Sequence, residues 1–222
     1  MSSPVRARVA YLGPAGTFSE EALLASAAIG SVEPVPLATI YDAVTALRRG
    51  EVEWAIAPIE NSLDGSISVT LDLLAQETGD LEIVGEALLG VRHSLIAAEP
   101  VELSEIDTVL SHPKVPGQCA LFLRHELPRA RILPAGSTAE AVRTVASAGR
   151  RGQAALGTAL AASIYGGIVI RDRVEDRDDN ETRFVWLARA GDGAQKHGRL
   201  DVVVVGDGNH GRNVQLFNLA GL

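Results

Sequence analysis

Short runs of aliphatic and β-branched residues alternate with longer stretches of helical character along residues 8–188. Strands are predicted at 8–12 and 54–58, for example, and helices at 116–127 and 138–148. Because two parallel strands need a crossover that is usually a helix, this alternation is typical of mainly parallel sheets with helices on their faces. The sequence therefore predicts an α/β fold.

Several predicted helices follow a strand and a small turn that carries a hydroxyl residue. Thr17 and Glu20 have the spacing of a capping box, and Ser137 and Glu140 repeat it. Two more helices begin after a glycine, near Ser68 and Thr158. In an open parallel sheet such turns lie at the carboxyl ends of the strands, where backbone N–H groups and helix dipoles favour anions. Capping alone explains any one turn, but the four together predict an anion-binding cleft.

The overall charge bears on the kind of ligand. The chain has 20 Lys and Arg against 28 Asp and Glu, a formal net charge of −8. An acidic balance argues against nucleic acid as a partner, because phosphates are bound by clustered Lys and Arg. The single cysteine, Cys119, excludes a disulfide framework and a multi-cysteine metal site, and it fits a reducing, cytoplasmic compartment. An anionic ligand would have to be held by local groups, because the global charge does not attract it.

The two ends of the chain differ from its middle. The residues up to Gly13 are predicted to form a first strand rather than a signal peptide. No apolar run approaches the roughly 20 residues that a membrane-spanning helix needs. Residues 191–222 hold 7 of the 22 glycines, and they are predicted to be a linker and a short tail with one apolar strand at Val202–Val205.

Three polar segments at strand ends carry the candidate chemistry. Asn61 follows a predicted strand, and its amide can both donate and accept hydrogen bonds, which suits a carbonyl or carboxylate ligand. Ser111 and Gln118 are neutral groups at a strand end and in a first helical turn. Thr182 begins a predicted strand, and its hydroxyl, held dry against a leaving hydroxyl, could deliver a hydrogen bond or relay a proton. On the residues alone, ordinary turn formation is the better explanation of the Asn61 segment.

Neighbouring residues are weaker candidates for the same roles. His112 has neither a Ser and Asp in triad order nor a second His at ligand spacing. Cys119 precedes apolar residues in a predicted helix, which favours a buried structural thiol over a nucleophile. Strand alternation places Thr182 and Phe184 on one face and Arg183 on the other.

Taken in order, these segments closely resemble the prephenate dehydratase family. The resemblance is carried by Tyr11–Glu20, Pro58–Ser62, Ser111–Pro113, Gln118–Cys119, Gly136–Ala139, Tyr165–Gly166 and Asn180–Phe184. No single segment is specific, but the ordered set is. The resemblance implies a catalytic domain at 1–190 with a two-lobed fold like that of type II periplasmic binding proteins and the active site in the interlobe cleft. Lobe one is expected at 1–90 and 168–190, and lobe two at 91–167.

The resemblance also implies a reaction. Prephenate would lose carbon dioxide and its ring hydroxyl to give phenylpyruvate, on the route to phenylalanine, with no metal and no organic cofactor. By match to the family motif, Thr182 would assist departure of the hydroxide. The residues that would orient the substrate and stabilise its transition state are Asn61, Ser111 and Gln118. The residues expected to bind the substrate are Thr17, Ser137, Thr138 and Arg183. A homodimer or higher homo-oligomer is implied.

Many members of the family continue into a regulatory ACT domain that binds phenylalanine. Residues 191–222 are too few for one and lack its usual signatures, so the tail is interpreted as a truncated ACT remnant or an unrelated segment, and phenylalanine feedback is not expected. Three alternatives stay open. They are arogenate as the substrate, a non-aromatising prephenate decarboxylase of secondary metabolism, and a non-catalytic binding module of the same fold.

Overall fold

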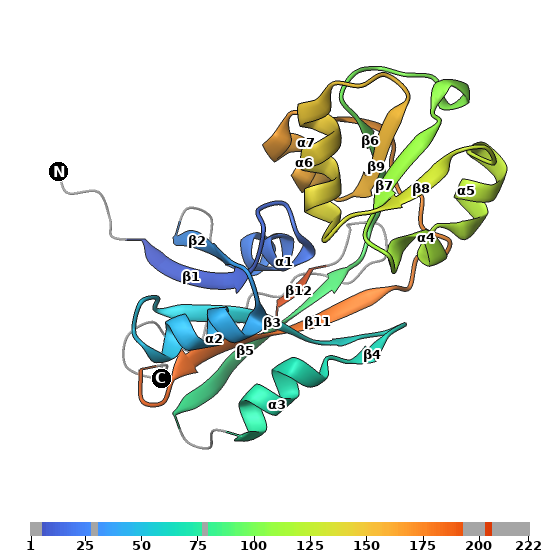
Figure 1. Ribbon diagram of the computed structural model, residues 1–222. Coiled ribbons are helices and arrows are strands. Elements are labelled where there is room, and N and C mark those ends of the chain that lie inside the picture. Colours follow the sequence, from blue (N-terminus) through green and yellow to red (C-terminus); the bar gives the residue numbers. More distant parts are fainter. Residues whose placement is uncertain (1–5, 28–30, 77–79, 193–202, 206–222) are drawn as a thin grey trace. The chain divides into compact units, whose positions relative to one another are not determined.

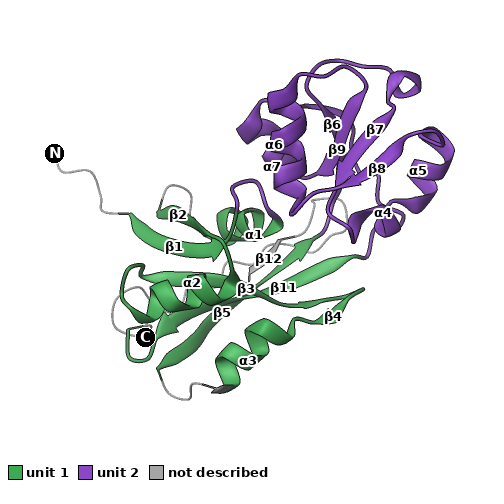
Figure 2. Cartoon of the chain, viewed as in Figure 1, with its two compact units in different colours: residues 1–13, 18–90, 180–222 green, residues 14–17, 91–179 purple. Residues whose placement is uncertain are grey.

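A computed structural model describes residues 6–27, 31–76, 80–192 and 203–205, and the chain divides into two compact units (Figure 2). Unit 1 takes the described residues within 1–13, 18–90 and 180–222, and unit 2 takes those within 14–17 and 91–179. Each unit is built around one sheet of its own, as two lobes require.

Unit 1 is a mixed sheet with helices on both faces (Figure 1). Its strands are β1 (Ala7–Leu12), β2 (Val32–Leu37), β3 (Trp54–Asn61), β4 (Gly65–Ser66), β5 (Leu81–Gly90), β11 (Glu181–Arg189) and β12 (Val203–Val205). Its helices are α1 (Phe18–Ser26), α2 (Ile40–Arg48) and α3 (Ser68–Gln76).

The strand order of unit 1 is β12-β5-β11-β3-β1-β2, with β4 paired to β3. Strands β1, β2 and β3 run parallel, whereas β11 runs antiparallel to both β3 and β5. The carboxyl ends of the three parallel strands therefore meet at one edge of the sheet, and β11 begins at that same edge.

The central strands of unit 1 are buried on both faces, which explains their nearly continuous apolar runs. Val9 and Tyr11 pack with Leu23 of α1, whereas Ala10 between them packs with Val44 of α2. The same alternation continues in β11, where Trp186 joins the first cluster.

Unit 2 repeats the layered arrangement. Its strands are β6 (Ser94–Ala97), β7 (Thr108–Ser111), β8 (Arg131–Pro134), β9 (Gln153–Gly157) and β10 (Ile168–Arg171). Its helices are α4 (Val115–Gln118), α5 (Ala120–Glu126), α6 (Thr138–Ala148), α7 (Ala159–Tyr165) and the 3₁₀ turn η1 (Leu103–Glu105). Helices α6 and α7 lie together on one face of the sheet, and α4 and α5 contribute to the core on the other (Figure 1).

The strand order of unit 2 is β10-β6-β9-β7-β8. Strands β7, β8 and β9 run parallel, and β6 runs antiparallel to β9 and to β10. As in unit 1, an antiparallel strand begins where the parallel strands end, because Ser94 at the start of β6 pairs with Gly157 at the end of β9.

Residues 168–179 do not belong to lobe one, contrary to the prediction. They fall in unit 2, because β10 pairs with β6 from Ile168↔Ala97 to Arg171↔Leu95. Residues 14–17 also fall in unit 2, where the carbonyl of Gly16 accepts a hydrogen bond from the Thr158 hydroxyl at 2.7 Å. Short local patterns could not reveal these pairings, because their partners are distant in the sequence.

Two further predictions differ from the structure. The sheets are mixed rather than mainly parallel, because β6 and β11 each run against both neighbours. The helix predicted at 116–127 is divided into α4 and α5 at Cys119, whose φ of −123° and ψ of 26° are not helical. The carbonyl of Gln118, next to this break, accepts a hydrogen bond from the N–H of Asp176.

The predicted linker and tail lie outside the described residues except for Gly191, Asp192 and β12, which pairs in parallel with β5. Over the part of the chain that is described, no helix has both the length and the apolar character needed to cross a bilayer.

Candidate functional site

In unit 1 the structure brings Thr182 and Asn61 together. They are direct partners in the antiparallel pairing of β11 with β3, at the edge where β1, β2 and β3 end. The Asn61 side chain reaches along this edge and its Nδ2 donates to Thr182 Oγ1 at 2.9 Å. The Thr182 side chain is on the sheet edge yet well buried, with a relative exposure of 8% for the residue.

The hydrogen bonds of Asn61 determine what its neighbour can do. Its Oδ1 accepts from the backbone N–H groups of Leu63 and Asp64, both at 3.0 Å, and this closes the turn after β3. Its Nδ2 is shared among Thr182, the Asn180 side chain and the Glu181 carbonyl. Asn61 is therefore placed to orient Thr182. Because Thr182 Oγ1 accepts this bond, its own hydroxyl proton is directed away from Asn61.

Asn180 was not singled out by sequence reasoning, although it stands in the motif that contains Thr182. It is buried, with 1% relative exposure, and its Oδ1 accepts from Asn61 Nδ2 at 2.9 Å. Asn61 and Asn180 are 119 residues apart, so no local pattern links them. The available signal was the presence of a second amide two residues before Thr182.

Arg183 is not brought together with Thr182. Its guanidinium lies 3.2 Å from Glu60 and 3.9 Å from Glu86, on the neighbouring strands β3 and β5. Because the pairing of β11 with β5 continues without a shift from Glu181 to Trp186, alternation holds and Arg183 faces away from Thr182.

In unit 2 the predicted residues gather at the edge where β7, β8 and β9 end. Ser111 is the last residue of β7, and its carbonyl accepts from the N–H of Ala135, which follows β8. Ser111 is buried, with its hydroxyl 3.2 Å from the carbonyl of His112. Ser137 then begins α6 at the same edge, and Thr158 begins α7 after β9.

The hydroxyl residues of two of these turns act as helix caps, which for Ser137 was predicted from its spacing to Glu140. Ser137 Oγ accepts from the N–H of Glu140 at 3.0 Å, and Thr158 Oγ1 accepts from the N–H of Ala161 at 2.9 Å. Thr138, in the first turn of α6, is buried. Thr17 ends the short segment 14–17 that unit 2 takes in.

Gln118 is joined by a histidine that the sequence did not single out. His93 Nε2 lies 2.8 Å from Gln118 Oε1, and the His93 side chain is buried directly before β6. Burial lowers the pKa of His93 below its usual value of 6.5, and the Gln118 hydrogen bond and the charge of Glu175 offset this only in part. The imidazole is therefore neutral near pH 7.

Cys119, next to Gln118, is completely buried and is not part of a disulfide. Burial, with the negative charges of Glu175 and Asp176, raises the pKa of its thiol to about 12. A thiol of this kind is not a nucleophile near pH 7, which agrees with the structural interpretation. In the described residues there is no group of three or more His, Cys, Asp or Glu side chains that could hold a metal ion.

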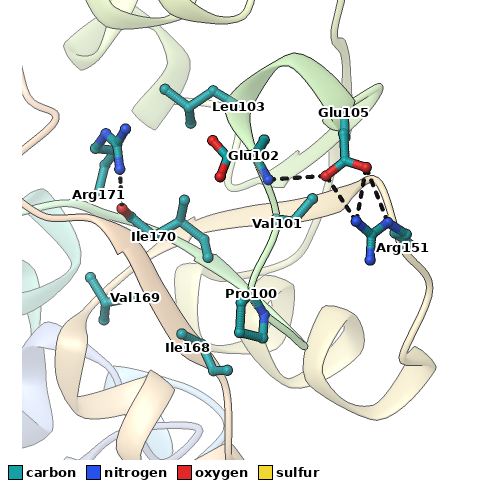
Figure 3. A pocket seen from close by; sticks show the side chains of 10 residues that line it. All are labelled: Pro100, Val101, Glu102, Leu103, Glu105, Arg151, Ile168, Val169, Ile170 and Arg171. Carbon is teal, nitrogen blue, oxygen red and sulfur yellow. Dashed lines mark hydrogen bonds and ion pairs between the residues drawn. The ribbon is translucent and has the colours of Figure 1, made fainter.

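A pocket of about 370 Å³ opens elsewhere in unit 2 (Figure 3). It is lined by residues 100–103, Glu105, Arg151 and residues 168–171, none of which was predicted to belong to the site. The Arg151 guanidinium is engaged by Glu105 at 2.9 Å. The pocket runs along β10 and η1 and includes neither Gln118 nor Ser111.

Comparison with known proteins identifies the family. The model of the family described as prephenate dehydratase matches residues 9–192. The chain belongs to the prephenate dehydratase family. A prephenate dehydratase of Amycolatopsis methanolica is 42% identical over 183 residues, which cover 82% of this chain and 58% of that protein. A chloroplastic arogenate dehydratase/prephenate dehydratase 2 of Arabidopsis thaliana is 40% identical over 85% of this chain and 48% of that protein.

A solved prephenate dehydratase shows the same fold. The structure from Arthrobacter aurescens, in complex with L-Phe, matches with a TM-score of 0.75 and 33% identity, over 83% of this chain and 61% of that one. The predicted α/β fold with two lobes is therefore confirmed. This chain spans about three fifths of the length of three curated prephenate dehydratases that it matches, at 58%, 62% and 60%.

Proposed function

We propose that this chain is a lyase that converts prephenate to phenylpyruvate, with loss of carbon dioxide and water. Family membership supports the reaction, and one observation carries the assignment of its central residue. Asn61 Nδ2 donates to Thr182 Oγ1 at 2.9 Å, so the Thr182 hydroxyl is left to donate its proton to another oxygen. A leaving hydroxyl needs such a donor.

The bond from the ring to its carboxylate breaks and releases carbon dioxide, and the electron pair of that bond moves into the ring. The carbon–oxygen bond of the ring hydroxyl breaks at the same time and the ring becomes aromatic. The hydroxyl departs with its bonding pair and acquires a proton to become water. Thr182 stabilises the departing oxygen by hydrogen bonding, and the proton comes from solvent, directly or through the Thr182 hydroxyl.

The gain of an aromatic ring supplies much of the driving force, so alignment matters more than a strong acid. Prephenate carries two carboxylates. We propose that Ser111, Gln118 and the first turns at Ser137 and Thr138 contribute to holding them, and that Thr17 takes part as the resemblance implies. Arg183, which faces away from Thr182 and is paired with Glu60 and Glu86, is left out of this set. Neutral donors at helix ends suit this task in a chain with a net charge of −8, because they bind anions through local dipoles.

We further propose a cytoplasmic location and a homodimer or higher homo-oligomer. The single cysteine supports a reducing compartment, and the family resemblance supports self-association.

A product assay tests the proposed reaction. The full chain is incubated with prephenate at neutral pH, beside a sample without protein and a sample of Thr182→Val, and products are followed by proton NMR and mass spectrometry. We expect an aromatic keto acid that has lost carbon dioxide and water, formed by the wild-type chain and at a greatly reduced rate by the variant. Equal turnover by wild type and variant would overturn the role of Thr182.

Other products would identify the alternatives. A non-aromatic diene that has lost only carbon dioxide would indicate a decarboxylase, and tight binding without turnover would indicate a binding module. The name of the Arabidopsis relative makes arogenate the natural competing substrate. A higher kcat/KM for arogenate than for prephenate would reassign the substrate while keeping the reaction.

A further inference from the structure

His93 lies in unit 2 directly before β6, the antiparallel strand that borders the parallel strands as β11 does in unit 1, where Thr182 is the second residue of the strand. Strand β6 begins at Ser94, which pairs with Gly157 at the end of β9. His93 is therefore at the edge where the parallel strands of unit 2 end, the edge that also carries Ser111. Its relative exposure is 1%, so a role by direct contact with solvent is excluded.

The contact of His93 with Gln118 defines how the amide can act. His93 Nε2 and Gln118 Oε1 are 2.8 Å apart. A carboxamide oxygen only accepts, so His93 must carry its proton on Nε2. An amide whose oxygen accepts from His93 has its N–H₂ group on the other side of the carboxamide carbon, and that group is the one that can donate to a ligand. That orientation suits a carboxylate and opposes a ligand that needs an acceptor.

The two residues are held by the same short segment of backbone. The N–H of Val174 donates to the His93 carbonyl at 2.9 Å, and the His93 N–H donates to Glu175 Oε2 at 2.8 Å. The N–H of Asp176 donates to the Gln118 carbonyl at 2.7 Å. Residues 174–176, which we call the strap, therefore fix the backbones of both partners independently of the bond between their side chains.

The strap begins at an unusual turn. Arg173 has a φ of 55°, and among the described residues it is the one non-glycine residue with a positive φ. A left-handed conformation is costly for a residue with a Cβ and persists only where the surroundings impose it. Here it turns the chain from β10 toward His93. Asp172, just before it, accepts from the Ser94 hydroxyl at 2.7 Å.

We propose that His93 is a positioning residue for Gln118, which it holds with the amide N–H₂ group toward a substrate carboxylate. The carboxylate assignment rests on the proposed function. His93 acts through Gln118 and does not touch the substrate. Neutral imidazole is sufficient for this role, because one N–H is all that the bond requires.

A double-mutant cycle tests the coupling. His93→Leu removes the donor and keeps much of the volume, and His93→Gln restores an N–H₂ group of similar reach. We expect His93→Leu to raise KM for prephenate about tenfold with a smaller change in kcat, and His93→Gln to recover part of the loss. In a Gln118→Ala background, His93→Leu should change kcat/KM by less than about twofold, because the residue through which it acts is gone.

The matched control is His125→Leu, since His125 is exposed on α5, and this variant should leave KM unchanged. Equal effects of His93→Leu with and without Gln118 would overturn the proposal and leave His93 a purely structural residue. His93→Gln covers the case in which His93→Leu does not fold.

A second readout does not depend on turnover. The imidazole ¹⁵N NMR spectrum of the wild-type chain should show His93 as the Nε2–H tautomer, with a shift that changes in Gln118→Ala. An Nδ1–H tautomer would overturn the proposal, because Nε2 would then accept from the Gln118 amide. Absence of turnover by a wild-type chain with the Nε2–H tautomer would instead count against the proposed function alone.

Discussion

The two units share an arrangement of three parallel strands beside one antiparallel strand. They differ in the residues that lie where the parallel strands end and the antiparallel strand begins. In both, three parallel strands end at one edge and an antiparallel strand begins there. In unit 1 that strand brings a hydroxyl, Thr182, held by the Asn61 amide. In unit 2 the residue before that strand is His93, and it holds an amide, Gln118, that comes from a helix.

The two groups are suited to different tasks. The hydroxyl of Thr182 accepts from its holder, so its own proton is available for a leaving group. The amide of Gln118 is held by its oxygen, so its N–H₂ group is the part that can donate to an anion. The edge where the parallel strands end thus carries a group suited to bond breaking in the sheet of unit 1. The corresponding edge in the sheet of unit 2 carries a group suited to binding. We call this difference the division of labour between the two units.

The largest effect is expected for Thr182→Val, which removes the hydroxyl and keeps the shape and strand preference of the side chain. Loss of a hydrogen-bond donor to the leaving group should reduce kcat by about 10² to 10⁴-fold. Steady-state kinetics with prephenate measure this. Thr182→Ser, which keeps the hydroxyl, is the control and should retain most of the activity; a variant as slow as Thr182→Val would refute the role of the hydroxyl.

A smaller but still large effect is expected for Asn61→Asp. The carboxylate can still accept from the N–H groups of Leu63 and Asp64, but it cannot donate to Thr182, whose proton would turn toward it. We expect kcat to fall about 10²-fold, and we expect Asn61→Asp to cause no further loss when it is added to Thr182→Val.

Ser62→Ala is the matched control for this change. The Ser62 hydroxyl accepts from the N–H of Glu181 at 3.0 Å, one residue away from Thr182, and its removal should alter kcat by less than about threefold. Fully additive losses in the Asn61→Asp, Thr182→Val double variant would show that Asn61 acts separately from Thr182.

The burial of His93 in unit 2 predicts that the stability of the chain depends on pH. Because burial lowers its pKa, the folded chain binds fewer protons than the unfolded chain once the pH falls below about 6.5. The free energy of unfolding should therefore decrease as the pH falls from 7.5 to 5.5, by at most about 1.4 kcal/mol per pH unit from this group. Urea unfolding at both pH values measures it.

The same experiment on His93→Gln supplies the comparison. Without a titrating ring the contribution disappears, so the variant should lose less stability than the wild type over the same interval. An identical pH dependence in the two proteins would mean that His93 is not held neutral by burial, the charge of Glu175 compensating for it.

The smallest effect is expected for Cys119→Ala. The thiol is buried beside Gln118, but its pKa of about 12 keeps it protonated and unreactive. We expect a loss of stability of about 1 kcal/mol and a kcat within twofold of the wild type. Thermal unfolding and steady-state kinetics check both. A large loss of kcat in a folded variant would give unit 2 a chemical role and break the division of labour.

Local patterns in the sequence were sufficient for part of this arrangement. Alternation along β11 correctly placed Thr182 and Arg183 on opposite faces of the strand. The spacing of Ser137 and Glu140 correctly predicted the cap of α6. Both depend on residues within one element or one turn.

The remaining features depend on partners that are far apart in the sequence. Asn61 is 119 residues from Asn180, and His93 is 25 from Gln118. The residues around His93 have the pattern of the start of a strand. Nothing in that pattern indicates that the imidazole is buried or that it contacts Gln118. Residues 168–179 were misplaced for the same reason, because β10 is assigned by its pairing with β6.

The most direct test of the division of labour is the steady-state kinetics of Thr182→Val and Gln118→Ala on prephenate, measured side by side. We predict that Thr182→Val lowers kcat and leaves KM nearly unchanged, whereas Gln118→Ala raises KM about tenfold or more and changes kcat much less. The reverse pattern, a KM effect at Thr182 with a kcat effect at Gln118, would contradict the assignment of bond breaking to unit 1 and binding to unit 2.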